Sequence, residues 1–402
     1  CFLLLLNFYE ELLISNANFL LIFSIILFFV IFSTFVVSFH NDLIFAIPFC
    51  IIPLTLRAFF DFKLGLFIHF FTIIIIAFLC DQSQLFFAIN FLGGFVAVST
   101  PGKIYTQSKL LFTILRISIV FLVVVTSISL LTSGSFNQID FSIIPMLMLS
   151  SILTFLTFPF IYLCEKAFSL VSDLSLLEYA DTNTELLRKL AKDAPGTFHH
   201  SLQVSHLSES VAIEIGANPL LVRAGALYHD IGKLNNPNFF IENQSLGSNP
   251  HDDLSFDESA KLIINHVIDG IELAKKHNLP DQLIDFIRTH HGDSLMQYFY
   301  KEYLKNFPEN VSDKNFRYPG PKPYNKETAI LMMCDSVEAA SRSLKKIDSN
   351  SINELVDRVI LSQFKQNQYD NSSLTFKEIN QIKNTLKLKL KDIHHTRITY
   401  PE

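Results

Sequence analysis

Positively charged residues are nearly missing from the first part of this chain. Of the 32 Lys and Arg residues among 402, residues 1–165 hold five: Arg57, Lys63, Lys103, Lys109 and Arg116. The rest of the chain has no basic block either, so the electrostatic footprint of a protein that binds a nucleic-acid polymer is absent. The sequence therefore indicates two consecutive parts, a first part suited to a lipid environment and a second part suited to water.

Paired cysteine spacing is also absent. The five cysteines are Cys1, Cys50, Cys80, Cys164 and Cys334. Most lie inside apolar runs, where they are expected to be small buried residues and not parts of a disulfide framework or zinc site. The chain begins inside the apolar run CFLLLL without Met and without a charged region. We therefore interpret it as a fragment, and no signal peptide is identified.

What the first part does contain is a series of long apolar runs. They cover residues 18–38, 43–60, 64–80, 85–99, 110–131 and 141–164. Most approach the roughly 20 residues that a helix needs to cross a bilayer, and the alternation typical of a membrane barrel is missing. We predict a multi-pass transmembrane region over residues 1–164, with residues 1–6 as the tail of one more helix.

Basic residues distinguish the two ends of this region. Arg57 and Lys63 lie in one loop region and Lys103 and Lys109 in another, whereas the loops HND, CDQSQ and SGSFNQID carry none. Basic loops face the cytoplasm, and six crossings return the chain to the same side. We therefore expect a multi-pass protein of the cell (inner) membrane, with everything after Glu165 in the cytoplasm.

The second part shows helical periodicity and no convincing strand alternation. We predict an all-α fold for the whole chain: a transmembrane helix bundle followed by a cytoplasmic helical bundle. A connecting helix is expected over residues 165–195, where Pro195-Gly196 stops it, and a domain over residues 196–402. Loops are expected at residues 235–255, 307–325 and 348–350.

Histidines gather in this second part. In TFHHSLQVSHL, a helix places His200 on an apolar face with Val204 and Leu207, whereas His199 faces solvent. An inward histidine by itself is more often a satisfied core residue than a metal ligand.

The stretch GALYHDIGK ends an apolar segment with His229, Asp230 and Lys233. A buried carboxylate is costly unless it is paired or binds a cation, and adjacent His and Asp can supply a nitrogen and a bridging oxygen to a metal. Lys233 can neutralise a phosphate oxygen. The alternative is an ordinary helix end, with Gly232 as its cap and Lys233 against the helix dipole.

Three further segments place polar residues where apolar helices are expected. These residues are His266, His290, His291 and Asp335. Each alone is better explained as structural. Together with His200, His229 and Asp230 they offer seven nitrogen or oxygen ligands, which two metals sharing Asp230 would use and one metal would not.

The order H…HD…H…HH…D resembles the HD-domain metallohydrolases, and more closely the PgpH-type seven-transmembrane HD phosphodiesterases, which hydrolyse cyclic di-AMP. The segments APGTFHHSL, YHDIGK, FFIENQ, NPHD, YPGPKP, DSVEAASRSL and HHTRITYP carry the resemblance. It implies an HD bundle with a di-iron or di-manganese centre. One metal would be bound by His200, His229, Asp230 and Asp335, and the other by Asp230, His266, His290 and His291.

The resemblance further implies a metal-dependent phosphodiesterase that opens cyclic di-AMP to linear 5′-pApA with a hydroxide activated by two metals. Asp230 and Lys233 would be catalytic. Candidate substrate contacts are Lys233, Tyr318, Pro319, Gly320 and Arg342. The sequence differs from the family at Asp293, where threonine is usual.

The family also has a first helix and an extracellular domain ahead of the membrane bundle. Partners then comprise the cyclic dinucleotide, the bilayer and an unknown extracellular ligand of that domain, and a homodimer is left open.

Three alternatives differ in substrate or activity. A cyclic di-GMP phosphodiesterase of the HD-GYP type carries Gly-Tyr-Pro after its double histidine, whereas this chain reads HHGDSLMQYFY. A (p)ppGpp hydrolase with an HD core is usually without a membrane part. A receptor with an inactive HD module would not need all seven ligands.

Overall fold

A computed structural model describes residues 16–99, 107–134, 142–244, 249–309, 312–344 and 348–395. Over these residues the secondary structure is helical apart from one isolated bridge between Leu295 and Arg317, which confirms the all-α prediction. The chain divides into two compact units, Cys1–Ser175 and Leu176–Glu402. The expected helix tail at residues 1–6, Lys103 and most of HHTRITYP lie outside the described residues.

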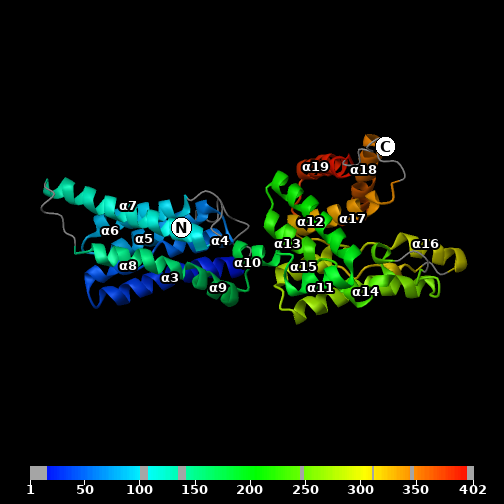
Figure 1. Ribbon diagram of the computed structural model, residues 1–402, viewed down its shortest axis with the longest axis horizontal. Coiled ribbons are helices and arrows are strands. Elements are labelled where there is room, and N and C mark those ends of the chain that lie inside the picture. The colour runs from blue at the N-terminus through cyan, green and yellow to red at the C-terminus, as the bar shows by residue number, and fades with distance from the viewer. Residues whose placement is uncertain are drawn as a thin grey trace, which may run out of the picture. The chain divides into compact units, whose positions relative to one another are not determined.

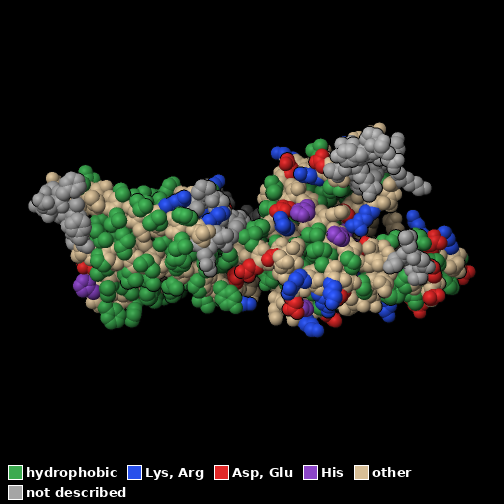
Figure 2. All heavy atoms as spheres, viewed as in Figure 1, with side chains coloured by type: hydrophobic (Ala, Val, Ile, Leu, Met, Phe, Trp, Pro, Cys, Tyr) green, Lys and Arg blue, Asp and Glu red, His purple; other side chains and the backbone are tan. Residues whose placement is uncertain are grey.

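The first unit consists of apolar helices. They are α3 (Asn16–Val37), η1 (Asn41–Ala46), α4 (Ile51–Phe59), α5 (Phe62–Ala77), α6 (Ser83–Val98), α7 (Gln107–Ser133), α8 (Ile144–Leu153), η3 (Thr154–Leu156) and α9 (Thr157–Phe168). Four stretches are long and apolar enough to cross a membrane: Asn16–Val37, Asn41–Phe59, Ser108–Thr132 and Ile144–Phe168. Helices α5 and α6 are apolar but shorter, so the number of crossings stays a prediction. Figure 2 shows hydrophobic side chains over most of the visible face of this unit, as a lipid-facing surface requires.

Two polar contacts mark opposite ends of this unit. Asn41, after α3, donates a hydrogen bond to Asp81, after α5. Arg57, at the end of α4, donates to the carbonyl oxygen of Val98 at the end of α6, 2.6 Å away. One end thus carries Asn41 and Asp81, and the other carries Arg57.

The predicted connecting helix over residues 165–195 is wrong as a single helix. The structure divides the segment into the end of α9, α10 (Asp173–Tyr179) and α11 (Glu185–Asp193). Between α10 and α11 the Asp181 carboxylate accepts a hydrogen bond from the backbone N–H of Asn183. Such local bonds from Asp and Asn compete with helical ones, and helical periodicity does not register them.

The second unit is a bundle of helices (Figure 1). They are α12 (Pro195–Ile215), α13 (Pro219–Tyr228), α14 (Phe256–Lys276), α15 (Asp281–Thr289), α16 (Gln297–Asn306), α17 (Lys326–Ser341), α18 (Ser349–Lys365) and α19 (Phe376–His395). Short 3-10 segments lie between them: η4 (Ile231–Asn235), η5 (Pro237–Phe239), η6 (Ile241–Asn243) and η7 (Lys314–Phe316).

Helix α17 lies at the centre of this unit. Its sequence is apolar on nearly all sides, which is typical of a buried helix, and α12, α13, α15, α18 and α19 pack on it. The core includes Val204, Leu207 and Val211 of α12, as the predicted inward face of His200 requires. Asp335 and Glu338 are buried acidic residues on α17, so the centre of the bundle holds two carboxylates that need partners.

Candidate metal centre

The seven predicted ligands lie together inside the second unit. His200 is on α12, His229 and Asp230 follow α13, His266 is on α14, His290 and His291 follow α15, and Asp335 is on α17. Six of them have exposed fractions of 5% or less, and His291 is half-buried. Residues on three helices and directly after two others, distant in sequence, therefore converge on one buried site.

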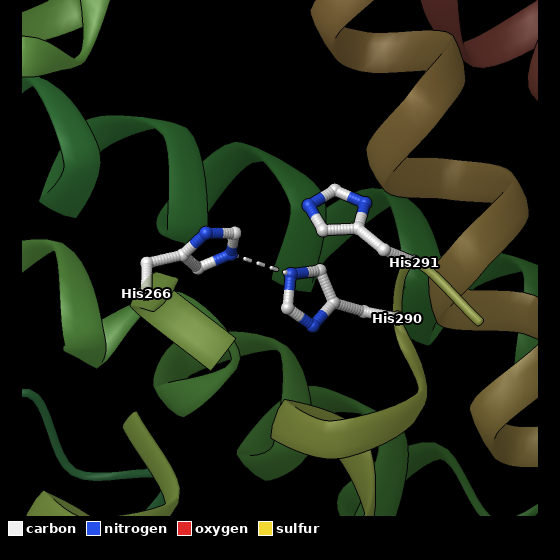
Figure 3. Close-up of side chains that lie close together, drawn as sticks. All are labelled: His266, His290 and His291. Atoms are coloured by element: carbon white, nitrogen blue, oxygen red, sulfur yellow. Dashed lines mark hydrogen bonds between the residues drawn. The ribbon is translucent and has the colours of Figure 1, made fainter. Parts of the chain in front are cut away.

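The histidines and Asp335 form two groups. The first group is His200, His229 and Asp335, and the second group is His266, His290 and His291. Within each group, one ligand atom per residue lies within 4.8 Å of the others. Figure 3 shows the second group, in which Nε2 of His266 lies 3.1 Å from Nε2 of His290.

Asp230 lies between the two groups. Its Oδ2 is 3.6 Å from Nε2 of His200 and 3.3 Å from Nε2 of His229. Its Oδ1 is 3.4 Å from Nε2 of His266 and 3.7 Å from Nε2 of His290. One carboxylate therefore presents one oxygen to each group.

Three of the histidines form a hydrogen bond from Nδ1 to a backbone carbonyl oxygen. A hydrogen bond donated by Nδ1 leaves the lone pair of a neutral imidazole on Nε2. In each case the acceptor belongs to the residue three positions earlier. The pairs are His229 with Ala226 at 2.7 Å, His266 with Ile263 at 2.5 Å, and His290 with Ile287 at 2.8 Å.

The donor set fits a divalent metal centre. Nε2 of His229 and Oδ1 of Asp230 are buried without a hydrogen-bond partner among the described residues, and such atoms are costly unless something binds them. Burial lowers the pKa values of the second group, to about 3 for His291, so these imidazoles are neutral and keep a lone pair. Imidazole nitrogens and carboxylate oxygens are ligands that first-row metals accept.

Lys233 contacts two carboxylates. Its Nζ lies 2.8 Å from Oδ2 of Asp230 and 2.8 Å from Oε1 of Glu242. Burial alone lowers the pKa of Lys233, but the charges of Asp230 and Glu242 outweigh it and raise the pKa above its ordinary value. The side chain therefore stays positively charged beside Asp230. Glu242, which lies within FFIENQ, is not among the predicted site residues.

The helix-cap alternative for Gly232 is wrong. Helix α13 ends at Tyr228 with His229 as its C-cap, and Gly232 lies within η4. A Cβ at Gly232 would lie 1.9 Å from the carbonyl oxygen of His266. The glycine is required because η4 approaches the backbone of α14 this closely.

A cavity of about 470 Å³ opens onto the site. Residues of both groups line it, together with Lys233, Tyr318 and Arg342. The Tyr318 ring lies beside His291, with ring centroids 4.2 Å apart. Of the described residues in the YPGPKP loop, Pro319 and Gly320 stay outside this lining, so the structure brings three of the five predicted substrate contacts to the cavity.

Asp293 and Glu338 make polar contacts that are not among the predictions. The Asp293 carboxylate accepts a hydrogen bond from Nε2 of Gln368 at 2.6 Å. Asp293, which stands where threonine is expected, therefore connects the segment after α15 to the segment after α18. Glu338 contacts both His200 and Arg342. Its spacing of four residues before Arg342 is the signal that predicts the second contact.

Two family models match the chain. The model described as "7TM receptor with intracellular HD hydrolase" matches residues 1–172, and the HD domain model matches residues 197–340. The cyclic-di-AMP phosphodiesterase PgpH of Bacillus subtilis (strain 168) is 39% identical over 316 residues, covering 77% of this chain and 44% of that protein. The protein of the same name from Listeria monocytogenes serotype 1/2a is 43% identical over 240 residues, covering 60% and 33%. The chain thus spans less than half the length of these two relatives.

A solved structure resembles the second unit. The crystal structure of the L. monocytogenes phosphodiesterase PgpH HD domain in complex with cyclic-di-AMP has 43% sequence identity and a TM-score of 0.52, and the match covers 53% of this chain and 100% of that chain. An HD domain implies divalent metal binding, which agrees with the donor set above. This chain belongs to the PgpH-type family of membrane proteins that carry an HD domain.

Proposed function

We propose that the chain is a membrane-bound, metal-dependent phosphodiesterase that hydrolyses cyclic di-AMP to linear 5′-pApA. The observation that carries this proposal is Asp230, whose two oxygens face two groups of candidate ligands, and residues of both groups line a cavity. The names of the two PgpH relatives, and the cyclic-di-AMP in the HD-domain crystal structure, support this substrate.

We propose two divalent ions, manganese or iron, as cofactors. The first would be held by His200, His229, Asp230 and Asp335, and the second by Asp230, His266, His290 and His291. When bound, such a pair supplies a Lewis acid that activates water near neutral pH and neutralises charge on a phosphodiester.

The chain's own residues would bind and orient the substrate. Lys233 holds a positive charge next to Asp230 on the cavity wall, where it can neutralise a phosphate oxygen. Arg342 supplies a second charge at the cavity, and the Tyr318 ring offers a face to a base. Attack of water at phosphorus and departure of the 3′-oxygen would then open the ring.

We further propose that the first unit crosses the membrane six times and leaves the second unit in the cytoplasm. The distribution of charge supports this: Arg57 and Lys63 belong to one end of the helices, and Asn41 and Asp81 to the other. The domain boundaries at residues 164 and 195, a homodimer and an extracellular ligand stay predictions.

The test is turnover by the whole chain, purified in detergent, stripped with a chelator and reloaded with manganese. Cyclic di-AMP, cyclic di-GMP and (p)ppGpp would be offered separately, with product identified by mass. We expect 5′-pApA from cyclic di-AMP with manganese and no turnover with chelator. Preference for another nucleotide would contradict the proposed substrate, and bound metal without any turnover would favour an inactive receptor module.

A further inference from the structure

We propose that Glu338 is a positioning residue of this site: one of its carboxylate oxygens orients His200 as a metal ligand, and the other holds Arg342 at the cavity. The inference rests on the proposed function, because it concerns how the first group is prepared to bind its metal.

Glu338 is held on both sides. It lies on α17 with an exposed fraction of 3%. Its Oε2 is 2.6 Å from Nδ1 of His200, and its Oε1 accepts hydrogen bonds from Nε and Nη2 of Arg342 at 2.9 and 2.7 Å. A buried carboxylate requires such partners, and here each oxygen has its own.

The contact with Glu338 determines which nitrogen of His200 is available. A carboxylate oxygen accepts the hydrogen bond that Nδ1 of His200 donates, so Nε2 is the nitrogen left to bind a metal in place of a proton. That Nε2 is 2.9 Å from Oδ1 of Asp335 and 3.6 Å from Oδ2 of Asp230. Glu338 therefore orients the ring so that Nε2 of His200 points toward the other proposed ligands of the first metal.

His200 differs in this respect from His229, His266 and His290. Their Nδ1 atoms contact backbone carbonyl oxygens, whereas the partner of Nδ1 in His200 is a side chain from another helix. Carboxylates and carbonyls are both usual outer partners of metal-bound histidine, and losing one typically weakens metal binding by about 10- to 100-fold. For His200 this outer partner is the side chain of Glu338, which a substitution can remove.

Arg342 connects the same carboxylate to the cavity. It lies one turn after Glu338 on the chain, at the spacing that brings side chains together, and it lines the cavity. Among the described residues Arg342 donates to Glu338 from Nε and Nη2, and Nη1 is left for an anionic ligand such as a phosphate. One carboxylate thus joins a proposed metal ligand to a proposed substrate contact.

The test compares Glu338→Ala, Glu338→Gln and Arg342→Ala in the whole chain in detergent. Bound manganese would be measured by titration with elemental analysis, and kcat and KM with cyclic di-AMP. We expect two manganese ions per wild-type chain. In Glu338→Ala, the affinity for one of them should fall about 10- to 100-fold while the other is kept. Arg342→Ala is the matched control: both ions should bind as in wild type, and KM should rise.

Glu338→Gln decides the question if the alanine variant does not fold. Glutamine has one acceptor oxygen for the two residues that donate here, His200 and Arg342. Either Nδ1 of His200 loses its acceptor and metal affinity falls, or Arg342 loses its acceptor and KM rises. A folded Gln variant with unchanged metal affinity and unchanged KM would overturn the role of Glu338. A wild-type chain that fails to bind two manganese ions would instead overturn the proposed function itself.

Discussion

A single side chain joins the two groups of the candidate centre. Oδ2 of Asp230 faces His200 and His229, whereas Oδ1 faces His266 and His290. Its contribution therefore differs in kind from that of a ligand that belongs to one group.

Asp230→Ala should abolish turnover, with kcat lowered roughly 10³-fold or more. The same change should lower the affinity for both manganese ions. The exposed Asp253 on the loop before α14 offers a matched control, and Asp253→Ala should keep both properties. Near-normal turnover by the Asp230 variant, or loss of a single ion, would refute a bridging role.

Two elements meet closely where the groups join. Gly232 of η4 lies against the backbone of α14, because a Cβ there would be 1.9 Å from the carbonyl oxygen of His266 and 2.5 Å from the N atom of Gly270. Asp230 and Lys233 flank this contact on one side and His266 on the other. The approach of two backbones thus sets the spacing between the groups.

Gly232→Ala should force η4 away from α14 and destabilise the second unit by more than about 2 kcal/mol, since a well-packed backbone contact cannot absorb a methyl group. Metal affinity should fall with it. Gly216→Ala is the comparison. A Cβ at Gly216 would meet no neighbouring atom within 4 Å, but φ of this residue is 71°, so backbone strain should cost about 1–2 kcal/mol. Metal affinity should be unchanged in this variant. Chemical denaturation measures the stability of both variants, and titration measures their manganese affinity. Equal losses of stability and of manganese affinity in the two variants would contradict the packing role of Gly232.

The last helix is attached by a charged contact. Glu378 near the start of α19 accepts a hydrogen bond from Nζ of Lys326 at 2.6 Å and another from the backbone N–H of Thr375 at 2.8 Å. Burial favours the neutral carboxyl, but these contacts outweigh it and lower the pKa of Glu378 below its ordinary value of 4.5. A lowered pKa contributes stability that is complete above the unfolded-state pKa and is lost as the pH falls through the folded-state pKa.

Glu378→Gln should therefore lower the melting temperature of the second unit by about 2 °C at pH 7. The difference from wild type should narrow as the pH falls below the ordinary carboxyl pKa. Glu354→Gln, exposed on α18, is the matched control. A difference that stays constant from pH 7 to pH 4 would show that the charge of Glu378 does not contribute.

At the scale of the whole molecule, the two ends of the first unit differ in charge. Gln84 comes three residues after Asp81 in the sequence, at the end without basic residues, and Lys63 follows Arg57 at the other end. The orientation proposed for the chain places these ends on opposite sides of the membrane.

Cysteine labelling in whole cells tests this orientation. In a Cys80→Ser background, Gln84→Cys should react with a membrane-impermeant maleimide from outside, because residue 84 is exposed. Lys63→Cys, also exposed, should react only after the membrane is permeabilised. The opposite pattern would place the second unit outside the cytoplasm.

Much of the centre was predictable because acids and histidines inside apolar helices are conspicuous. His200 could be assigned inward from its helical face, and Asp335 from its apolar surroundings. Glu338 was not recognised, because an acid four residues before an arginine also describes a surface pair. The alternative role of Gly232 as a helix cap is wrong, since its constraint comes from His266, which is remote in sequence and reaches it only through folding.

The type of group that accepts the Nδ1 hydrogen bond of each histidine determines which substitutions its position tolerates. At positions 226, 263 and 287 the acceptor is a backbone carbonyl, which every amino acid carries, so no replacement deletes it. Position 338 alone among these four supports its histidine with a side chain. Among these four positions, inactivating changes in a saturation library should accumulate at 338, whereas the other three positions should accept any residue that fits the available volume.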